Sequence, residues 1–179
     1  DEENLAMIAS IPHVEIVSPV LSFDVIAKQG SYEGYLNLRG MSLETLEKLD
    51  IPLAEGRLPL AGNTEVELVM GNQIIYNFYD TKNTMDYYEY EPPDIDFMNS
   101  PLFVIFDIDA FYNSQSGEGE MPKKHLINTS GLVEGTPEEY NQHSYNVYVD
   151  IEALKFQLSK IFKNQPIPGQ PTTPAGKPY

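Results

Sequence analysis

The sequence predicts a mixed α+β fold, and three observations point to it. Several segments are dense in β-branched and aromatic residues and end at glycine or polar turns, as strands do. Two segments carry apolar residues at helical spacing directly after the capping residues Ser42 and Asp150. No repeat of fixed period is visible, which disfavours a solenoid or a propeller. We therefore expect strands and helices that share a packed core.

The composition fits a folded domain and disfavours several functions. With 179 residues, 41% of them hydrophobic, the chain is long enough for one large domain or two small lobes. Eleven basic and 27 acidic residues give a net charge of -16, which repels phosphate backbones and anionic lipid surfaces. The absence of cysteine excludes disulfides and thiolate metal sites, and it is compatible with an exported bacterial domain.

The two ends are expected to be cut from a larger protein. No apolar run approaches the roughly 20 residues that span a bilayer, and the start lacks a signal-peptide pattern. The acidic residues 1–3 resemble the start of a helix already under way, and the chain stops in a proline-rich segment.

The first half of the chain predicts a helix, a hairpin, a second helix and a buried strand. Gly30 supplies the hairpin turn, and Ser42 caps the second helix, in which Leu43, Leu46 and Leu49 form the buried side. In chain order we expect a helix at 3–10, strands at 14–27 and 32–39, a helix from 43 that ends before a turn at 56–59, a strand at 66–70 and a helix at 72–79.

The second half predicts a further pair of strands and one long helix. The helix after Asp150 carries the apolar stripe Ile151, Leu154, Leu158 and Ile161. We expect a loop at 80–98, strands at 102–108 and 124–133 that form a second sheet, a turn at 113–122 between them, a strand at 145–149, and a proline-rich spacer from 164.

Three passages occur in an order and spacing that a known family shares. The first is Ile11-Pro12-His13-Val14-Glu15. The second runs from Leu49 to Pro59 and continues from Glu65 to Ile74, and the third runs from Tyr148 to Lys155. Together they resemble the extracytoplasmic domain of MacB-like ABC transporter permeases, a group that includes lipoprotein-release and FtsX-type permeases.

The resemblance implies a two-lobed domain without catalysis. It implies a porter-like βα lobe from residues 1–64 and 146–163, an inserted mainly β lobe from residues 65–145, and a proline-rich linker at 164–179. The domain would lie on the extracytoplasmic face of the bacterial membrane, between transmembrane helices. Its implied partners are a second permease protomer, a cytoplasmic ATP-binding subunit or domain, and an extracellular protein or peptide substrate.

One loop suggests a ligand site, although a solvated loop explains it more simply. The stretch 80–96 interleaves six carboxylates with Tyr87, Tyr88 and Tyr90. Carboxylates could bind calcium, but the spacing does not match an EF-hand loop. Tyrosine rings could also stack on a sugar, although packing against their own sheet is the simpler expectation.

Catalytic motifs are not found in the sequence. Asp107 and Asp109 lie two apart in an expected strand and so would share one face, as the polar face of a half-exposed strand also requires. The histidines, His13, His125 and His143, are too widely separated to indicate a zinc site. The sequon at Asn128 lies in an expected strand and is interpreted as accidental. The sequence therefore predicts no catalytic residue, no cofactor site and no metal site.

Two other functions stay open at this stage. A secreted or surface-anchored module could bind carbohydrate or protein through the tyrosine-rich loop, with or without calcium. A hydrolase would depend on Asp107 and Asp109 alone. The resemblance favours the transporter domain over both.

Overall fold

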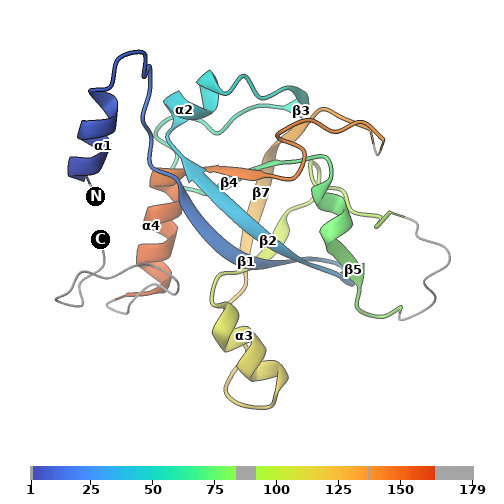
Figure 1. Cartoon of the computed structure of the whole chain (residues 1–179). Coiled ribbons are helices and arrows are strands. Elements are labelled where there is room, and N and C mark those ends of the chain that lie inside the picture. The colour runs from blue at the N-terminus through green and yellow to red at the C-terminus, as the bar shows by residue number, and fades with distance from the viewer. Residues whose placement is uncertain (1, 84–91, 137, 164–179) are drawn as a thin grey trace.

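The computed structural model describes residues 2–83, 92–136 and 138–163, and it confirms a mixed α and β architecture (Figure 1). The elements, in chain order, are α1 (Glu2–Ala9), β1 (Leu21–Gln29), β2 (Tyr32–Met41), α2 (Leu43–Lys48), β3 (Leu53–Gly56), β4 (Glu67–Met70), the 3-10 helix η1 (Ile74–Asn77), β5 (Phe78–Asp80), β6 (Leu102–Ile105), α3 (Ile108–Gln115), β7 (His125–Val133), β8 (Val147–Asp150) and α4 (Ile151–Ile161). None of the helices within these ranges is long and apolar enough to cross a membrane.

All eight strands belong to one sheet, so the expected second sheet is wrong. Six strands pair in a closed ring, in the order β1, β6, β7, β4, β8, β2 and back to β1. β5 extends the sheet from β2, and β3 pairs with β7. Strands from all three parts of the predicted lobe division lie in this sheet, and the two-lobe arrangement is not confirmed.

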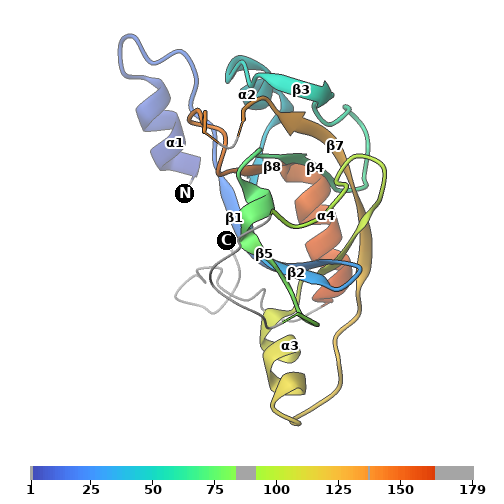
Figure 2. The same ribbon diagram turned by 90° about the vertical axis from the view of Figure 1, so that its right-hand side faces the viewer.

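The main core lies on the face of the sheet that α4 covers (Figure 2). Leu154 and Leu158 of α4 are fully buried among side chains of β1, β2, β4, β6 and β8. Gly40 of β2 permits this close approach, because a Cβ at that position would lie 3.1 Å from a methyl group of Leu154. The predicted apolar stripe of α4 is therefore confirmed as part of the main core.

Local signals in the sequence predicted several elements correctly. The hairpin turns at Gly30, whose φ is 59°, and continues over nine paired positions from Leu21↔Gly40 to Gln29↔Tyr32. The Ser42 side chain caps α2 by accepting from the N–H of Thr45, and Asp150 caps α4 by accepting from the N–H of Glu152.

Other element predictions are wrong, and long-range pairing is the main reason. Residues 14–20 form no strand, because the hairpin begins only at Leu21. The expected helix at 72–79 is a short 3-10 turn followed by β5, since residues 78–80 pair with β2. β3 was missed, and the strand expected at 102–108 ends at Ile105 before α3 begins.

Residues 2–20 lie outside the packed body. Both views show α1 set apart from the sheet and joined to β1 by a long connection (Figures 1 and 2). Its apolar side chains Met7 and Ile8 are 63% and 41% exposed, and Ile11 in the connection is 51% exposed. We refer to residues 2–20 as the arm and to the rest of the described chain as the body.

Candidate functional site

The acid pair does not have the geometry that the sequence suggested. Asp107 and Asp109 do not lie on a strand, because the chain has already turned into α3. Asp107 is the N-cap of that helix, and its carboxylate accepts a hydrogen bond of 2.9 Å from the N–H of Ala110. Asp109 lies in the first turn and is exposed. The prediction of a shared strand face is therefore wrong, and a capping role explains Asp107.

The three histidines lie in three different environments. His13 is exposed in the arm, and it has a positive φ of 69°. His125 begins β7, where its ring contacts Phe106 at 5.6 Å and Gln157 lies 3.2 Å from its Nδ1. His143 is buried beside Tyr148. Within the described part of the chain, His, Asp and Glu residues form no group of three or more that could hold a metal ion.

The structure describes the sequon at Asn128 fully but the acidic loop 80–96 only in part. Tyr87, Tyr88 and Tyr90 of the acidic loop lie outside the described residues. The carboxylate of Asp96 accepts hydrogen bonds from the N–H groups of Met98 and Asn99, which lowers its pKa. The sequon at Asn128 lies in β7, as expected, with its neighbours Thr129 and Ser130 buried.

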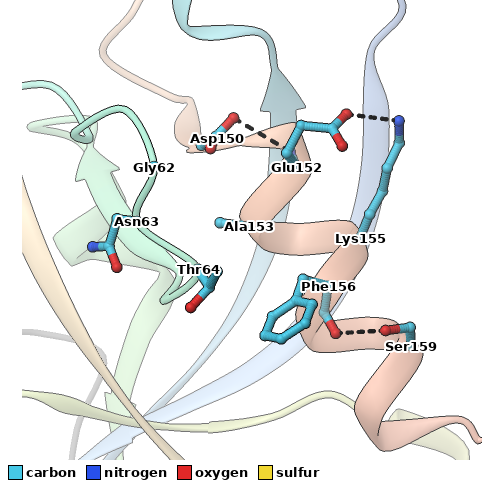
Figure 3. Close-up of a pocket in the computed structure, with 9 residues that line it drawn as sticks. All are labelled: Gly62, Asn63, Thr64, Asp150, Glu152, Ala153, Lys155, Phe156 and Ser159. Carbon is cyan, nitrogen blue, oxygen red and sulfur yellow. Dashed lines mark hydrogen bonds and ion pairs between the residues drawn. The ribbon is translucent and has the colours of Figure 1, made fainter.

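A groove of about 520 Å³ lies between residues 62–64 and the exposed side of α4 (Figure 3). Gly62, Asn63 and Thr64 form one wall, and Ala153 and Phe156 contribute to the other. The ring of Phe156 is 41% exposed. The groove is therefore open and partly apolar.

Several polar groups of this groove already have hydrogen-bond partners within the body. Glu152 accepts from the Nζ of Lys155 at 2.9 Å, and the Ser159 hydroxyl donates to the Phe156 carbonyl at 2.7 Å (Figure 3). Asp150 serves as the cap of α4. The Ser159 hydroxyl is thus bonded to a backbone carbonyl, whereas a nucleophile in covalent catalysis is activated by an adjacent base. The groove therefore provides a surface for contact.

A second apolar cluster joins two of the three passages that carry the family resemblance. β4 and β8 are neighbours in the sheet, where Val69 pairs with Tyr148. The side chains of both residues are buried together with Ile51, and three partly buried leucines of the same passage, Leu49, Leu53 and Leu58, pack on them. The second and third matched passages, far apart in sequence, therefore build one packed unit.

An ion pair connects the two halves of the second passage. The Arg57 guanidinium contacts both carboxylate oxygens of Glu67, at 2.7 and 3.1 Å. This hydrogen-bonded contact holds the pKa of Glu67 below its usual value. The backbone N–H of Arg57 also donates to the backbone carbonyl of Ser130 at 2.7 Å. The turn at 56–59 is thus fixed to β4 and β7.

A buried polar pair lies at the edge of the same cluster. The Nδ1 of His143 and the hydroxyl of Tyr148 are hydrogen bonded at 2.8 Å, and both residues are less than 5% exposed. Burial lowers the pKa of His143 and raises the pKa of Tyr148, because both charged forms are poorly solvated there. The pair satisfies two polar groups within the body, and neither residue lines the groove beside α4.

The structure also shows a cleft that the sequence analysis missed. It lies beside the outer side of the β1–β2 hairpin and α3, and it brings Asp24, Tyr35 and Asn37 close to Asp109 and Tyr112. Alternation along the hairpin could have shown that Asp24, Tyr35 and Asn37 face outward. The approach of α3 depends on tertiary packing, so the sequence alone gave no signal for it.

Comparisons with known proteins find similarity among solved structures. No family model matches the chain, and no curated protein matches it. Among solved structures, the extracellular domain of the noncanonic ABC-type transporter YknZ from Gram-positive bacteria is similar, with 10% identity and a TM-score of 0.46. The similarity covers 86% of this chain and 64% of that domain.

Proposed function

We propose that this chain is the extracytoplasmic domain of a MacB-like ABC permease and has no catalysis of its own. The observation that carries the proposal is the union of the second and third matched passages in β4, β8 and the cluster around Tyr148. The residues that carry the resemblance therefore have a shared packing role. Such a role suits a domain that transmits movement as a rigid body.

The proposed role is mechanical. Closure of a cytoplasmic ATP-binding subunit or domain would move membrane helices that flank this domain, and two copies of the domain would move with them. The domain would act at the extracytoplasmic face of a bacterial membrane on a protein or peptide. The division into a lobe from residues 1–64 and 146–163 and an inserted lobe at 65–145 stays a prediction, as does the linker role of residues 164–179.

A mechanical role requires mobile junctions between rigid parts, and Gly56 and Pro59 make the turn at 56–59 a sequence-based candidate for one. The contacts of Arg57 with Glu67 and Ser130 fix this turn to the body instead. The arm, which has few buried side chains, is the better junction within the described residues.

Purification from the native host tests the proposal. A tag on the chromosomal copy would allow the whole protein to be extracted from membranes with a mild detergent. We expect it to co-purify with an ATP-hydrolysing subunit or domain. Recovery from the soluble fraction or the culture medium, without any ATPase, would contradict the proposal.

The same experiment addresses the second candidate, a secreted or surface-anchored binding module. The cleft with two exposed tyrosines at β2 and α3 favours a binding function. Release into the medium would support this module. Recovery with an ATPase would exclude it as the whole function of the protein.

A further inference from the structure

The missed cleft has the shape and the composition of a ligand site. It has a volume of about 480 Å³, and residues of β1, β2 and the start of α3 line it. Figure 1 shows how α3 leaves the sheet near these strands. Two tyrosines, two aspartates and one asparagine line it, together with apolar side chains such as Ile108. A concave surface with apolar area and a few convergent polar groups is typical of small-molecule sites.

The two tyrosines are exposed but held in place. Tyr35 on β2 is 47% exposed, and Tyr112 on α3 is 53% exposed. The hydroxyl of Tyr35 donates to Asp24, and this hydrogen bond together with partial burial raises the pKa of Tyr35 to about 12. The ring of Tyr112 packs edge-on against Phe111 at 5.4 Å. Ordered rings of this kind can stack on a ligand with little loss of conformational entropy.

The polar groups of the cleft offer acceptors and donors side by side. Asp24 and Asn37 are directly opposite each other on the hairpin, and the Asn37 amide donates to the Asp24 carboxylate at 2.6 Å. A carboxylate has about four acceptor positions, and an amide has two donors and a carbonyl oxygen. Capacity therefore remains for hydroxyl groups, which both donate and accept.

The charges in the cleft exclude one class of ligand. Asp24 and Asp109 line it, and no lysine or arginine is among the described residues that do so. The whole chain carries a net charge of -16. A phosphorylated or carboxylated ligand would be repelled, whereas a neutral polyol would not.

We propose that this cleft binds an uncharged saccharide, with Tyr35 and Tyr112 stacking on its apolar faces and Asp24 and Asn37 hydrogen bonding to its hydroxyl groups. The site does not depend on the transporter proposal, because a secreted module could carry it equally well. No described residue of the acidic loop 80–96, in which the sequence suggested sugar binding, is among those that line the cleft.

Titration of the whole 179-residue chain with neutral oligosaccharides tests the site. Cellotriose, maltotriose and chitotriose are suitable probes, and a lysine-rich peptide serves as the cationic alternative. Heteronuclear NMR would follow backbone amides at concentrations up to about 10 mM, since a shallow site is expected to have a dissociation constant of roughly 1 mM. We expect at least one oligosaccharide to shift amides of β1, β2 and α3.

Two variants and a matched control make the result specific. Tyr112→Ala and Asn37→Ala alter exposed side chains, so both should stay folded, and each should weaken saccharide binding about tenfold. Tyr145→Ala removes a tyrosine that is 61% exposed and outside the cleft, and it should leave binding unchanged. No binding by any oligosaccharide, equal binding by all variants, or shifts at these amides caused only by the peptide would overturn the proposal.

Discussion

The helices α1 and α4 have similar apolar content but opposite relations to the rest of the chain. α4 buries Leu154 and Leu158 completely in the main core, whereas Met7 and Ile8 of α1 stay exposed. An isolated helix of eight residues is marginally stable in water, so α1 gains little from its own hydrogen bonds. The fold is therefore determined by the body, and the arm is a separate element with low local stability.

The largest effect is expected from removing an anchor of α4. Leu154→Ala should lower the free energy of unfolding by about 2–5 kcal/mol, because it leaves a cavity in a fully buried site. Denaturant unfolding followed by circular dichroism measures the loss. Phe156→Ala, on the exposed side of the same helix, is the control and should cost about 1 kcal/mol or less. Equal losses would show that α4 does not seal the core.

A somewhat smaller effect is expected at the turn that links β3 to the body. Gly56 has a φ of 79°, and a Cβ there would lie 2.1 Å from the carbonyl oxygen of Ser130. Gly56→Ala should therefore cost about 2–4 kcal/mol in unfolding free energy.

Gly62→Ala separates the two causes of that loss. Gly62 has nearly the same φ, 77°, but a Cβ there meets no atom within 4 Å. Its substitution should cost only the backbone strain, about 1 kcal/mol. If both substitutions destabilise the protein equally, close packing at Gly56 does not contribute.

Acidification should weaken the body through two histidines, the buried His143 and the partly buried His125. Burial lowers the pKa of His143, and burial with a smaller effect of Lys123 lowers the pKa of His125. Each histidine is more easily protonated in the unfolded chain, so stability is highest above pH about 6.5 and falls as the pH drops toward the lowered pKa values. His143→Gln should make the loss of stability with falling pH shallower. Thermal unfolding, measured at a series of pH values from about 6.5 downward, checks this. An unchanged slope would show that His143 does not contribute.

The smallest effect is expected in the arm. Met7→Ala should change the free energy of unfolding by less than about 0.5 kcal/mol, because this residue is already 63% exposed. Hydrogen exchange should likewise show that the amides of α1 exchange much faster than those of α4. A loss above 1 kcal/mol, or equal protection of both helices, would contradict the separation of arm and body.

The elements that the sequence predicted correctly depend on local signals. Ser42 and Asp150 cap the helices that follow them, and Gly30 supplies the hairpin turn, so neighbouring residues were sufficient. The ring of strands depends on pairings between distant segments, such as Ile26 with Ile105, which no local pattern specifies. For the same reason β5 was interpreted as part of a helix.

The candidate sites show the same limit of local patterns. The spacing of Asp107 and Asp109 suggested an acid pair on one strand face, yet Asp107 caps a helix. Tyr35 and Tyr112 come from β2 and α3, and only the folded chain brings them to one cleft. The matched passages could be recognised from sequence, whereas their contact through Val69 and Tyr148 required the structure.

The proposed transporter role requires this domain to lie outside the cytoplasm, and cysteine labelling in intact cells tests that location. The 179 residues contain no cysteine, so Ser116→Cys adds one exposed thiol to this domain in the full-length protein. The unsubstituted protein is the control for cysteines elsewhere. Intact cells would be treated with a membrane-impermeant maleimide. We expect the membrane-bound protein to be labelled before the cells are opened. Labelling only after the cytoplasmic membrane is permeabilised would show that the domain lies in the cytoplasm.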